Sequence, residues 1–242
     1  MNKRTELHRF LVKLDAQTGA VIWELKMPKD DPMMKTRSGY ESVRFTEDGG
    51  FIAGGFARWQ SEEFPFFKSS GQVDEGFPIM EKFSAAVANA NTQFDQPPIP
   101  EWQYMCGSKG THAECELTGS AKTMRVYKDD GVEKVVALSH GCAFMVLNAG
   151  DGSAVGLMNN REKETGDANH DVEVEIIDGK VKGFIVAGIY GGTDSETAGC
   201  TEKGECTDPV TGGKACCTIE GFIAKWDKVS FFFNFSFLVL YF

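Results

Sequence analysis

The sequence predicts an all-β fold made of repeated four-stranded antiparallel units. Three observations predict it: a hairpin near the start recurs in weaker form, a second hairpin type with an acidic–glycine turn alternates with it, and most cysteines fall in two insertions between the repeats. One hairpin of each type makes a four-stranded meander, which is the sequence pattern of a propeller blade. The predicted fold is therefore an incomplete β-propeller of about three blades with two cysteine-containing loop insertions.

The first hairpin type is clearest near the N-terminus. Phe10–Leu14 and Val21–Leu25 are rich in branched and aromatic residues, which suit half-buried strands, and a short polar connector joins them. In that connector, Asp15 can accept hydrogen bonds from backbone N–H groups, and Gly19 can take the positive φ of a bulged turn. Trp23 lies in the returning strand, where its ring can cover a neighbouring sheet.

A second copy of this hairpin covers residues 143–156, which read AFMVLNAGDGSAVG. Asn148 takes the position of Asp15, Gly152 takes that of Gly19, and a glycine replaces the tryptophan. We therefore expect the same strand, turn and strand in this part of the chain.

Two shorter copies are incomplete. Residues 222–227, FIAKWD, repeat the first strand through Trp226 and Asp227 and stop where the turn should follow. Residues 66–74, FFKSSGQVD, keep only the lysine and a turn glycine. The repeat is thus best preserved at its first occurrence and degenerates along the chain.

The second hairpin type joins an extended run to an apolar strand through an acidic–glycine turn. It occurs at residues 41–55, 123–139 and 171–189. Glu-Asp-Gly, Asp-Asp-Gly and Asp-Gly are strong hairpin signals when strands flank them. Because the two hairpin types alternate, the pattern favours a propeller over the alternative, an ordinary antiparallel β-sandwich.

The stretch LDAQTGAVIW resembles the tryptophan-docking repeat of the quinoprotein-type (PQQ-like) and WD40-like β-propeller family. The matching residues are Asp15, Thr18, Gly19 and, four residues after the glycine, Trp23. EDGGFIAGG and GFIAKWD are also similar to repeats of secreted bacterial propellers. The resemblance implies blade-to-blade packing with Trp23 as a structural dock, but it implies no activity because one fold hosts many functions.

The repeats divide the chain into a partial propeller, residues 1–228, and an atypical hydrophobic tail, residues 229–242. Propellers close with about four to eight blades, so we expect open blade edges that invite self-association. The N-terminal residues carry no signal-peptide pattern, so we also expect a truncated start. The predicted parts are a half blade at 8–27, a blade at 41–80, an insertion at 81–120, a blade at 121–158 and a blade at 171–228 that contains a cysteine-rich insertion at 191–218.

Six of the seven cysteines lie in the two insertions, which contain little apolar matter with which to form a core. Disulfides would compensate for that deficit and predict an extracellular or lumenal location. Zinc bound with His112 is the alternative, although neither insertion has the CxxC pair typical of zinc sites. The disulfide candidates are Cys106, Cys115, Cys200, Cys206, Cys216 and Cys217.

Two further groups of residues are candidates for chemistry. Cys142 lies next to His140, where a buried free thiol is the expectation and a Cys–His nucleophile the alternative. Asp167, Asn169 and Asp171 place oxygen ligands at calcium-loop intervals. The Val-Glu-Val-Glu run that follows is typical of a strand, so the pattern favours a solvated strand face, with a calcium site as the alternative.

Charge and motifs restrict the function. The net charge of −10 argues against a nucleic-acid partner, because phosphate binding needs clustered Lys and Arg. Without a phosphate loop, nucleophile elbow or HExxH motif, we expect no catalytic residue and no cofactor, and a non-catalytic scaffold that binds a protein or a glycan. The alternative is a fragment of a quinoprotein-type oxidoreductase that uses PQQ with calcium, which the docking repeat and the adjacent Cys216 and Cys217 favour.

The C-terminal tail is the one segment with a possible relation to a membrane. At 14 residues, 229–242 is shorter than the roughly 20 that a helix needs to span a bilayer. We therefore expect membrane contact only through this tail, if at all, and an aggregation hazard wherever it is exposed.

Overall fold

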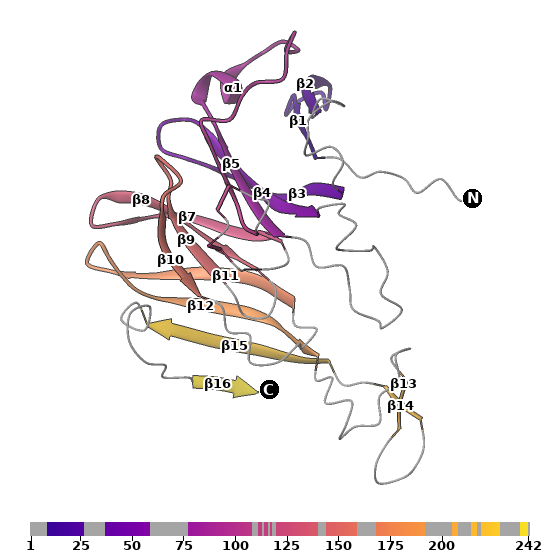
Figure 1. The fold of residues 1–242 in the computed structure, drawn as a ribbon, viewed down its shortest axis with the longest axis vertical. Coiled ribbons are helices and arrows are strands. Elements are labelled where there is room, and N and C mark those ends of the chain that lie inside the picture. The colour runs from indigo at the N-terminus through magenta and orange to yellow at the C-terminus, as the bar shows by residue number, and fades with distance from the viewer. Residues whose placement is uncertain are drawn as a thin grey trace.

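Among the residues that it describes, the computed structural model contains one short helix and otherwise strands and their connections, so the predicted all-β class is confirmed. Its named strands pair antiparallel, in three four-stranded sheets and two two-stranded hairpins. Figure 1 shows the larger sheets following one another in chain order along the longest axis. The structure describes residues 9–26, 37–58, 77–107, 111–112, 114–115, 117, 120–139, 144–158, 168–191, 205–207, 214–216, 219–227 and 238–241.

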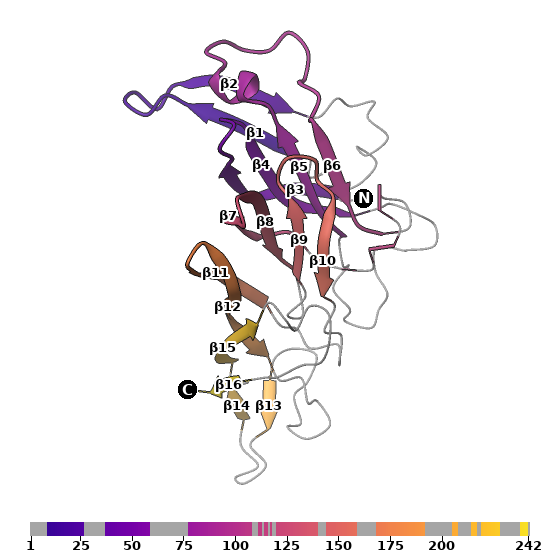
Figure 2. The same ribbon diagram turned by 90° about the vertical axis from the view of Figure 1, so that its left-hand side faces the viewer.

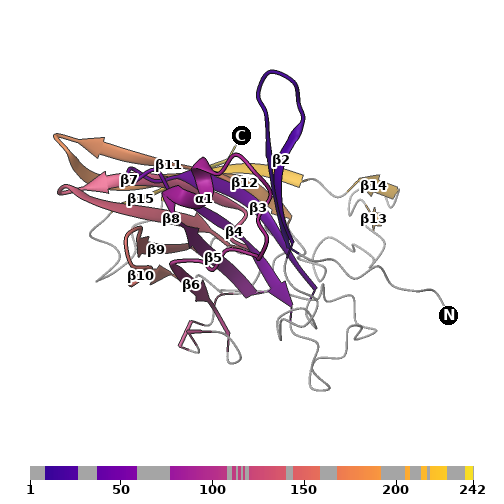
Figure 3. The ribbon, with the colours of Figure 1, turned by 90° about the horizontal axis from the view of Figure 1, so that it is seen from above.

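The N-terminal hairpin pairs β1 (Phe10–Leu14) with β2 (Val21–Lys26). Leu11 lies opposite Leu25, and both side chains are buried on the face that packs against the next sheet, together with Trp23. Seen from above in Figure 3, the turn of this hairpin projects away from the other sheets.

The second sheet is a meander in the order β3-β4-β5-β6. A five-residue helix, α1 (Ala85–Asn89), lies in the connection between β5 and β6. The prediction placed residues 81–120 in an insertion, but β6 lies within that range and completes this sheet. Its four residues, WQYM, follow a proline-rich run that hid the strand signal. The strands are β3 (Arg37–Phe45), β4 (Phe51–Arg58), β5 (Phe77–Phe83) and β6 (Trp102–Met105).

The third sheet is a meander in the order β7-β8-β9-β10. Its first turn places Asp130 at φ 50° and Gly131 at φ 80°, the two consecutive positive values that a tight two-residue hairpin turn requires. The strands are β7 (Thr123–Asp129), β8 (Val132–Leu138), β9 (Phe144–Asn148) and β10 (Ala154–Met158).

The fourth sheet has the order β11-β12-β15-β16, and the small hairpin of β13 and β14 branches from it between β12 and β15. Strand β16 pairs with β15, so part of the segment predicted as an atypical tail supplies the fourth strand of this sheet. The strands are β11 (Ala168–Ile177), β12 (Lys180–Gly191), β13 (Glu205–Thr207), β14 (Lys214–Cys216), β15 (Ile219–Asp227) and β16 (Leu238–Tyr241).

Hydrophobic cores lie between successive sheets, because the central strands of the sheets carry apolar side chains on both faces. On β4, Phe51 and Ala53 face the N-terminal hairpin, whereas the intervening Ile52 faces the third sheet. On β8, Val135 packs toward the second sheet and Val136 toward the fourth. This two-sided burial explains the nearly continuous apolar runs of these strands.

The first strands of the larger sheets lie side by side: β3 contacts β7, and β7 contacts β11. The turns that follow these strands also meet. Glu47 forms an ion pair with Lys128 at 2.6 Å, and Asp130 forms one with Lys180 at 3.8 Å. Figures 1 and 2 show the sheets as an open series, and the described residues do not close into a ring.

Candidate functional site

The turn of the N-terminal hairpin is organised by Asp15. Its Oδ1 accepts hydrogen bonds from the Gln17 N–H at 3.1 Å, the Thr18 N–H at 2.7 Å and the Thr18 hydroxyl at 2.7 Å. Gly19 has φ 71°, a conformation that favours glycine. The hydrogen bonds from the Thr18 hydroxyl, the Thr18 N–H and the Gln17 N–H lower the pKa of Asp15.

The turn between β9 and β10 has the same backbone pattern. The Gly19 N–H donates to the Asp15 carbonyl, and the Gly152 N–H donates to the Asn148 carbonyl, both at 2.9 Å. A second bond spans each turn, from Asp15 to Ala20 and from Asn148 to Ser153. The two turns predicted to be equivalent thus share their hydrogen-bonding scheme.

Their side chains differ in role. Asn148 Nδ2 donates to Ser153 Oγ at 2.7 Å, whereas the Asp15 carboxylate accepts hydrogen bonds from its turn. Asp151 takes the acceptor role, with bonds from the Ser153 N–H and hydroxyl. The two turns therefore share their backbone hydrogen bonds but differ in which side chain accepts hydrogen bonds within the turn.

Trp23 is buried between the hairpin and the second sheet, 4% exposed. Its ring lies 5.5 Å from that of Phe94, in the connection between β5 and β6, and packs in one cluster with Phe51 and Phe83. The indole Nε1 is buried and has no hydrogen-bond partner within the described part of the chain.

Trp102 makes a corresponding contact one sheet further along, which sequence reasoning missed. Its Nε1–H donates to the Ala149 carbonyl at 3.0 Å. A Cβ on Gly152 would lie 2.7 Å from its ring, so glycine is required there by space as well as by φ. Trp23, on β2, contacts the β5–β6 connection of the second sheet. In the same way Trp102, on β6, contacts the β9–β10 turn of the third sheet. Trp102 ends the proline-rich run QPPIPEW, residues 96–102, which lies inside the predicted insertion 81–120. A tryptophan at that position was the available sign of a docking contact.

Trp226 and Asp227, the last two residues of the predicted repeat pattern, lie in β15. Trp226 is opposite Phe184 and Asp227 is opposite Gly183 in the register with β12. Their strand assignment agrees with the predicted first-strand copy, FIAKWD. Their side chains lie outside the described part of the structure, as does the faint copy at residues 66–74.

Charged residues line the adjacent first strands and form the candidate site, which we name the inner-strand row: Arg44 on β3, Arg125 on β7, and Asp171 and Glu173 on β11. Arg44 Nε donates to the Met124 carbonyl at 2.8 Å. Arg125 Nη2 donates to Asp171 Oδ1 at 2.7 Å, and its Nε lies 3.8 Å from Glu173 Oε2. Arginines thus join the second sheet to the third and the third to the fourth.

The row is open to solvent at its acidic end. The side chains of Asp171 and Glu173 are 58% and 71% exposed, whereas that of Arg125 is 28% exposed. Burial lowers the pKa of Arg44, and the positive charge of Arg125 lowers it further. Such a row offers carboxylate acceptors and guanidinium donors side by side.

A cluster of charged and polar side chains surrounds the buried Glu81 carboxylate of the second sheet. Glu81 accepts hydrogen bonds from the Tyr40 hydroxyl and from Gln103 Nε2, and Arg9 Nη1 lies 3.4 Å from its carboxylate. Arg9 and Glu81 are each 1% exposed. The cluster ties the residue before β1 to β3, β5 and β6, which is a role in holding the fold.

The disulfide prediction has one described outcome. Cys106 and Cys115 are fully buried and joined by a disulfide, so the zinc alternative does not hold for this pair. His112 stacks on Tyr104 instead, with ring centroids 3.7 Å apart. Cys206 on β13 lies opposite Ala215 on β14.

The other cysteine predictions fall largely outside the described residues. Cys142, His140, Cys200 and Cys217 lie there, whereas Cys216 is on β14 opposite Glu205. The structure therefore adds no pairing for these thiols.

Of the three calcium candidates, the described structure gives side-chain contacts for Asp171 alone. Asp167 lies outside it, Asn169 is a β11 residue, and Asp171 pairs with Arg125. In the part of the chain that the structure describes, no three His, Cys, Asp or Glu side chains converge as metal ligands.

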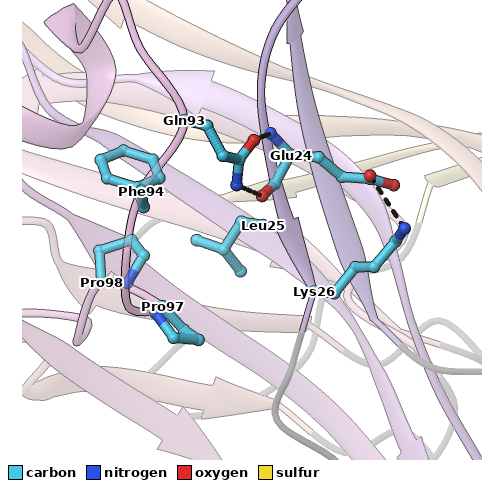
Figure 4. A pocket seen from close by; sticks show the side chains of 7 residues that line it. All are labelled: Glu24, Leu25, Lys26, Gln93, Phe94, Pro97 and Pro98. Carbon is cyan, nitrogen blue, oxygen red and sulfur yellow. Dashed lines mark hydrogen bonds and ion pairs between the residues drawn. The ribbon is translucent and has the colours of Figure 1, made fainter.

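A small cavity of about 220 Å³ lies beside the outer edge of β2 (Figure 4). Its lining combines polar and apolar residues from β2 and the β5–β6 connection. Its lining residues are Glu24, Leu25, Lys26, Gln93, Phe94, Pro97 and Pro98.

Across the described ranges, no helix is long and apolar enough to cross a membrane. No protein-family model matches the chain, and no curated protein matches it either.

Proposed function

We propose that this chain is a β-propeller segment that acts as a binding scaffold for a protein or a glycan. The observation that supports this most is the adjacency of β3, β7 and β11, joined by Arg44 and Arg125. In propellers, blades are arranged around a central channel, and neighbouring blades pack face to face. The inner-strand row would then face that channel.

The chemistry of the row suits a polar ligand. The exposed carboxylates of Asp171 and Glu173 can accept hydrogen bonds from glycan hydroxyls or peptide N–H groups. The net charge of −10 disfavours nucleic acid. The disulfide of Cys106 and Cys115 supports an extracellular or lumenal setting, where such bonds persist.

Glycan and peptide arrays probed with the full-length protein test this function. We expect a ligand whose binding falls several-fold in Glu173→Gln. Asp178→Asn is the matched control, because Asp178 is an exposed acid in the β11–β12 turn and Asn also tolerates its φ of 52°. A ligand bound equally by both variants, or no ligand on either array, would count against the proposal.

A catalytic role is the competing outcome. Substrate-dependent dye reduction after addition of PQQ and calcium would replace the scaffold by a quinoprotein-type oxidoreductase. The docking turn around Asp15 would then be the scaffold part of that enzyme.

A further inference from the structure

The outer edge of β2 is a strand edge that the hairpin leaves open. Among the described strands, β2 pairs only with β1. Its remaining backbone N–H and C=O groups therefore face away from the hairpin. Edges of this kind pair readily with strands of other chains unless something blocks them.

The Gln93 side chain forms hydrogen bonds with this edge at the backbone of Glu24. Its Nε2 donates to the Glu24 carbonyl at 2.8 Å, and its Oε1 accepts from the Glu24 N–H at 2.9 Å (Figure 4). A carboxamide offers one donor and one acceptor side by side, as the backbone of a paired residue does. Gln93 thus makes the two bonds that one residue of an added antiparallel strand would make.

The charges along this edge are self-complementary. Glu24 and Lys26 lie on the same face of β2, with Nζ and Oε2 2.9 Å apart. When two β2 strands pair antiparallel with Leu25 opposite Leu25, Glu24 of each copy lies opposite Lys26 of the other. Opposite charges across strands stabilise such a pair, and the arrangement has the two-fold symmetry of an isologous dimer.

The space beside Leu25 also suits this partner. The cavity of about 220 Å³ has Leu25, Phe94 and Pro97 in its lining. In the paired register, Leu25 of a second copy comes to the same face as the cavity. The incoming Leu25 side chain would therefore lie next to the apolar part of the cavity lining.

We propose that Gln93 is an edge guard that keeps β2 from pairing antiparallel with β2 of a second copy of this chain. Its two hydrogen bonds to Glu24 compete with those of the incoming strand. Loss of the carboxamide leaves an edge whose charge pattern and neighbouring cavity select another β2.

Sedimentation equilibrium and amide exchange of the full chain test the proposal. We expect wild type and Gln96→Ala, a control on the same exposed segment, to be monomeric at micromolar concentration. Gln93→Ala should dimerise, with a dissociation constant for the dimer at least tenfold lower than that of wild type. In dilute solution its Glu24 amide should exchange on the order of tenfold faster, because the bond to Gln93 is lost.

Charge variants test the register. In the Gln93→Ala background, Lys26→Glu should disperse the dimer, because like charges would face each other across the strands. Adding Glu24→Lys to it restores opposite charges and should restore the dimer. Should Gln93→Ala fail to fold, Gln93→Glu keeps the shape, loses the donor to the Glu24 carbonyl and should also dimerise.

Three results would overturn the proposal. One is a folded Gln93→Ala or Gln93→Glu variant with the sedimentation behaviour of Gln96→Ala. Another is a wild-type chain that already dimerises as strongly as the Gln93 variants. The third is a Gln93→Ala dimer that Lys26→Glu leaves intact, since that dimer would not use the β2 edge.

Discussion

The indole N–H of Trp102 donates to the carbonyl oxygen of Ala149 at 3.0 Å, and this bond joins the last strand of the second sheet to the β9–β10 turn of the third. The same ring lies against Gly152, whose φ is 73°. One side chain therefore both donates a hydrogen bond to a turn of the neighbouring sheet and packs against it. Stacking of the sheets depends on that contact as well as on the apolar core.

Substitution of Trp102 should separate the hydrogen bond from the ring packing. Trp102→Phe keeps an aromatic ring but leaves the buried Ala149 carbonyl without this donor, which should cost about 1 kcal/mol. Trp102→Ala also removes the packing and should cost about 3 kcal/mol. Urea unfolding measures both, and equal stability of Trp102→Phe and wild type would contradict the role of the bond.

Gly152→Ala should cost more than Gly131→Ala, although both glycines have positive φ. At Gly131 an added Cβ meets nothing within 4 Å, so only backbone strain of about 1 kcal/mol applies. At Gly152 the Cβ also meets the Trp102 ring, which should add about 2 kcal/mol. If thermal unfolding shows the same loss for both variants, the Trp102 contact is absent in solution.

The buried pair of Arg9 and Glu81 should show strong coupling. Glu81→Leu leaves the Arg9 guanidinium buried without its counter-charge and should cost about 3–5 kcal/mol. Arg9→Met combined with Glu81→Leu removes both charges and should be less destabilising than Glu81→Leu alone. A double-mutant cycle in urea with additive losses would show that the two side chains do not interact.

Stability should depend on Asp48 in acid. Hydrogen bonds from Lys82 and then Thr46 lower the pKa of Asp48 from 3.8 to about 2. The ionised form is therefore favoured by folding, so its contribution is complete above about pH 4 and is lost as the pH falls toward 2. Because the carboxylate is half exposed, we expect about 1 kcal/mol.

Asp48→Asn tests this contribution. The variant should be less stable than wild type at pH 6, and the difference should shrink between pH 4 and pH 2. Urea midpoints across this range provide the measurement, with Asp178→Asn as an exposed acidic control. A difference that stays constant with pH would assign the loss to something other than the charge of Asp48.

Local patterns were sufficient to predict the hairpins. The Asp-Gly turns after β7 and β11 have the positive φ values that their residues favour, and strong apolar runs flank them. The turn at Asp15 carries its own hydrogen-bond acceptors, so its geometry is encoded within five residues. Predicting such turns does not require information about residues far away in the sequence.

Features that depend on distant partners were missed. β6 is only four residues long, and its place in the sheet is set by pairing with β5. Trp102 docks on residues almost fifty positions away, and Arg44 bonds to a carbonyl eighty positions away. Gln93 occupies a strand edge that no local pattern reveals. Tertiary packing decides these contacts, so local sequence patterns do not predict them.

A two-dimensional NOE experiment on the indole protons tests the docking of sheet on sheet most directly. The chain has four tryptophans, and comparison with Trp102→Phe assigns the Trp102 indole N–H. We expect cross-peaks from Trp102 ring and indole protons to the Hα of Gly152. A Trp102 indole with no cross-peak to residues 149–152, and with rapid solvent exchange, would contradict the stacking of the second sheet on the third.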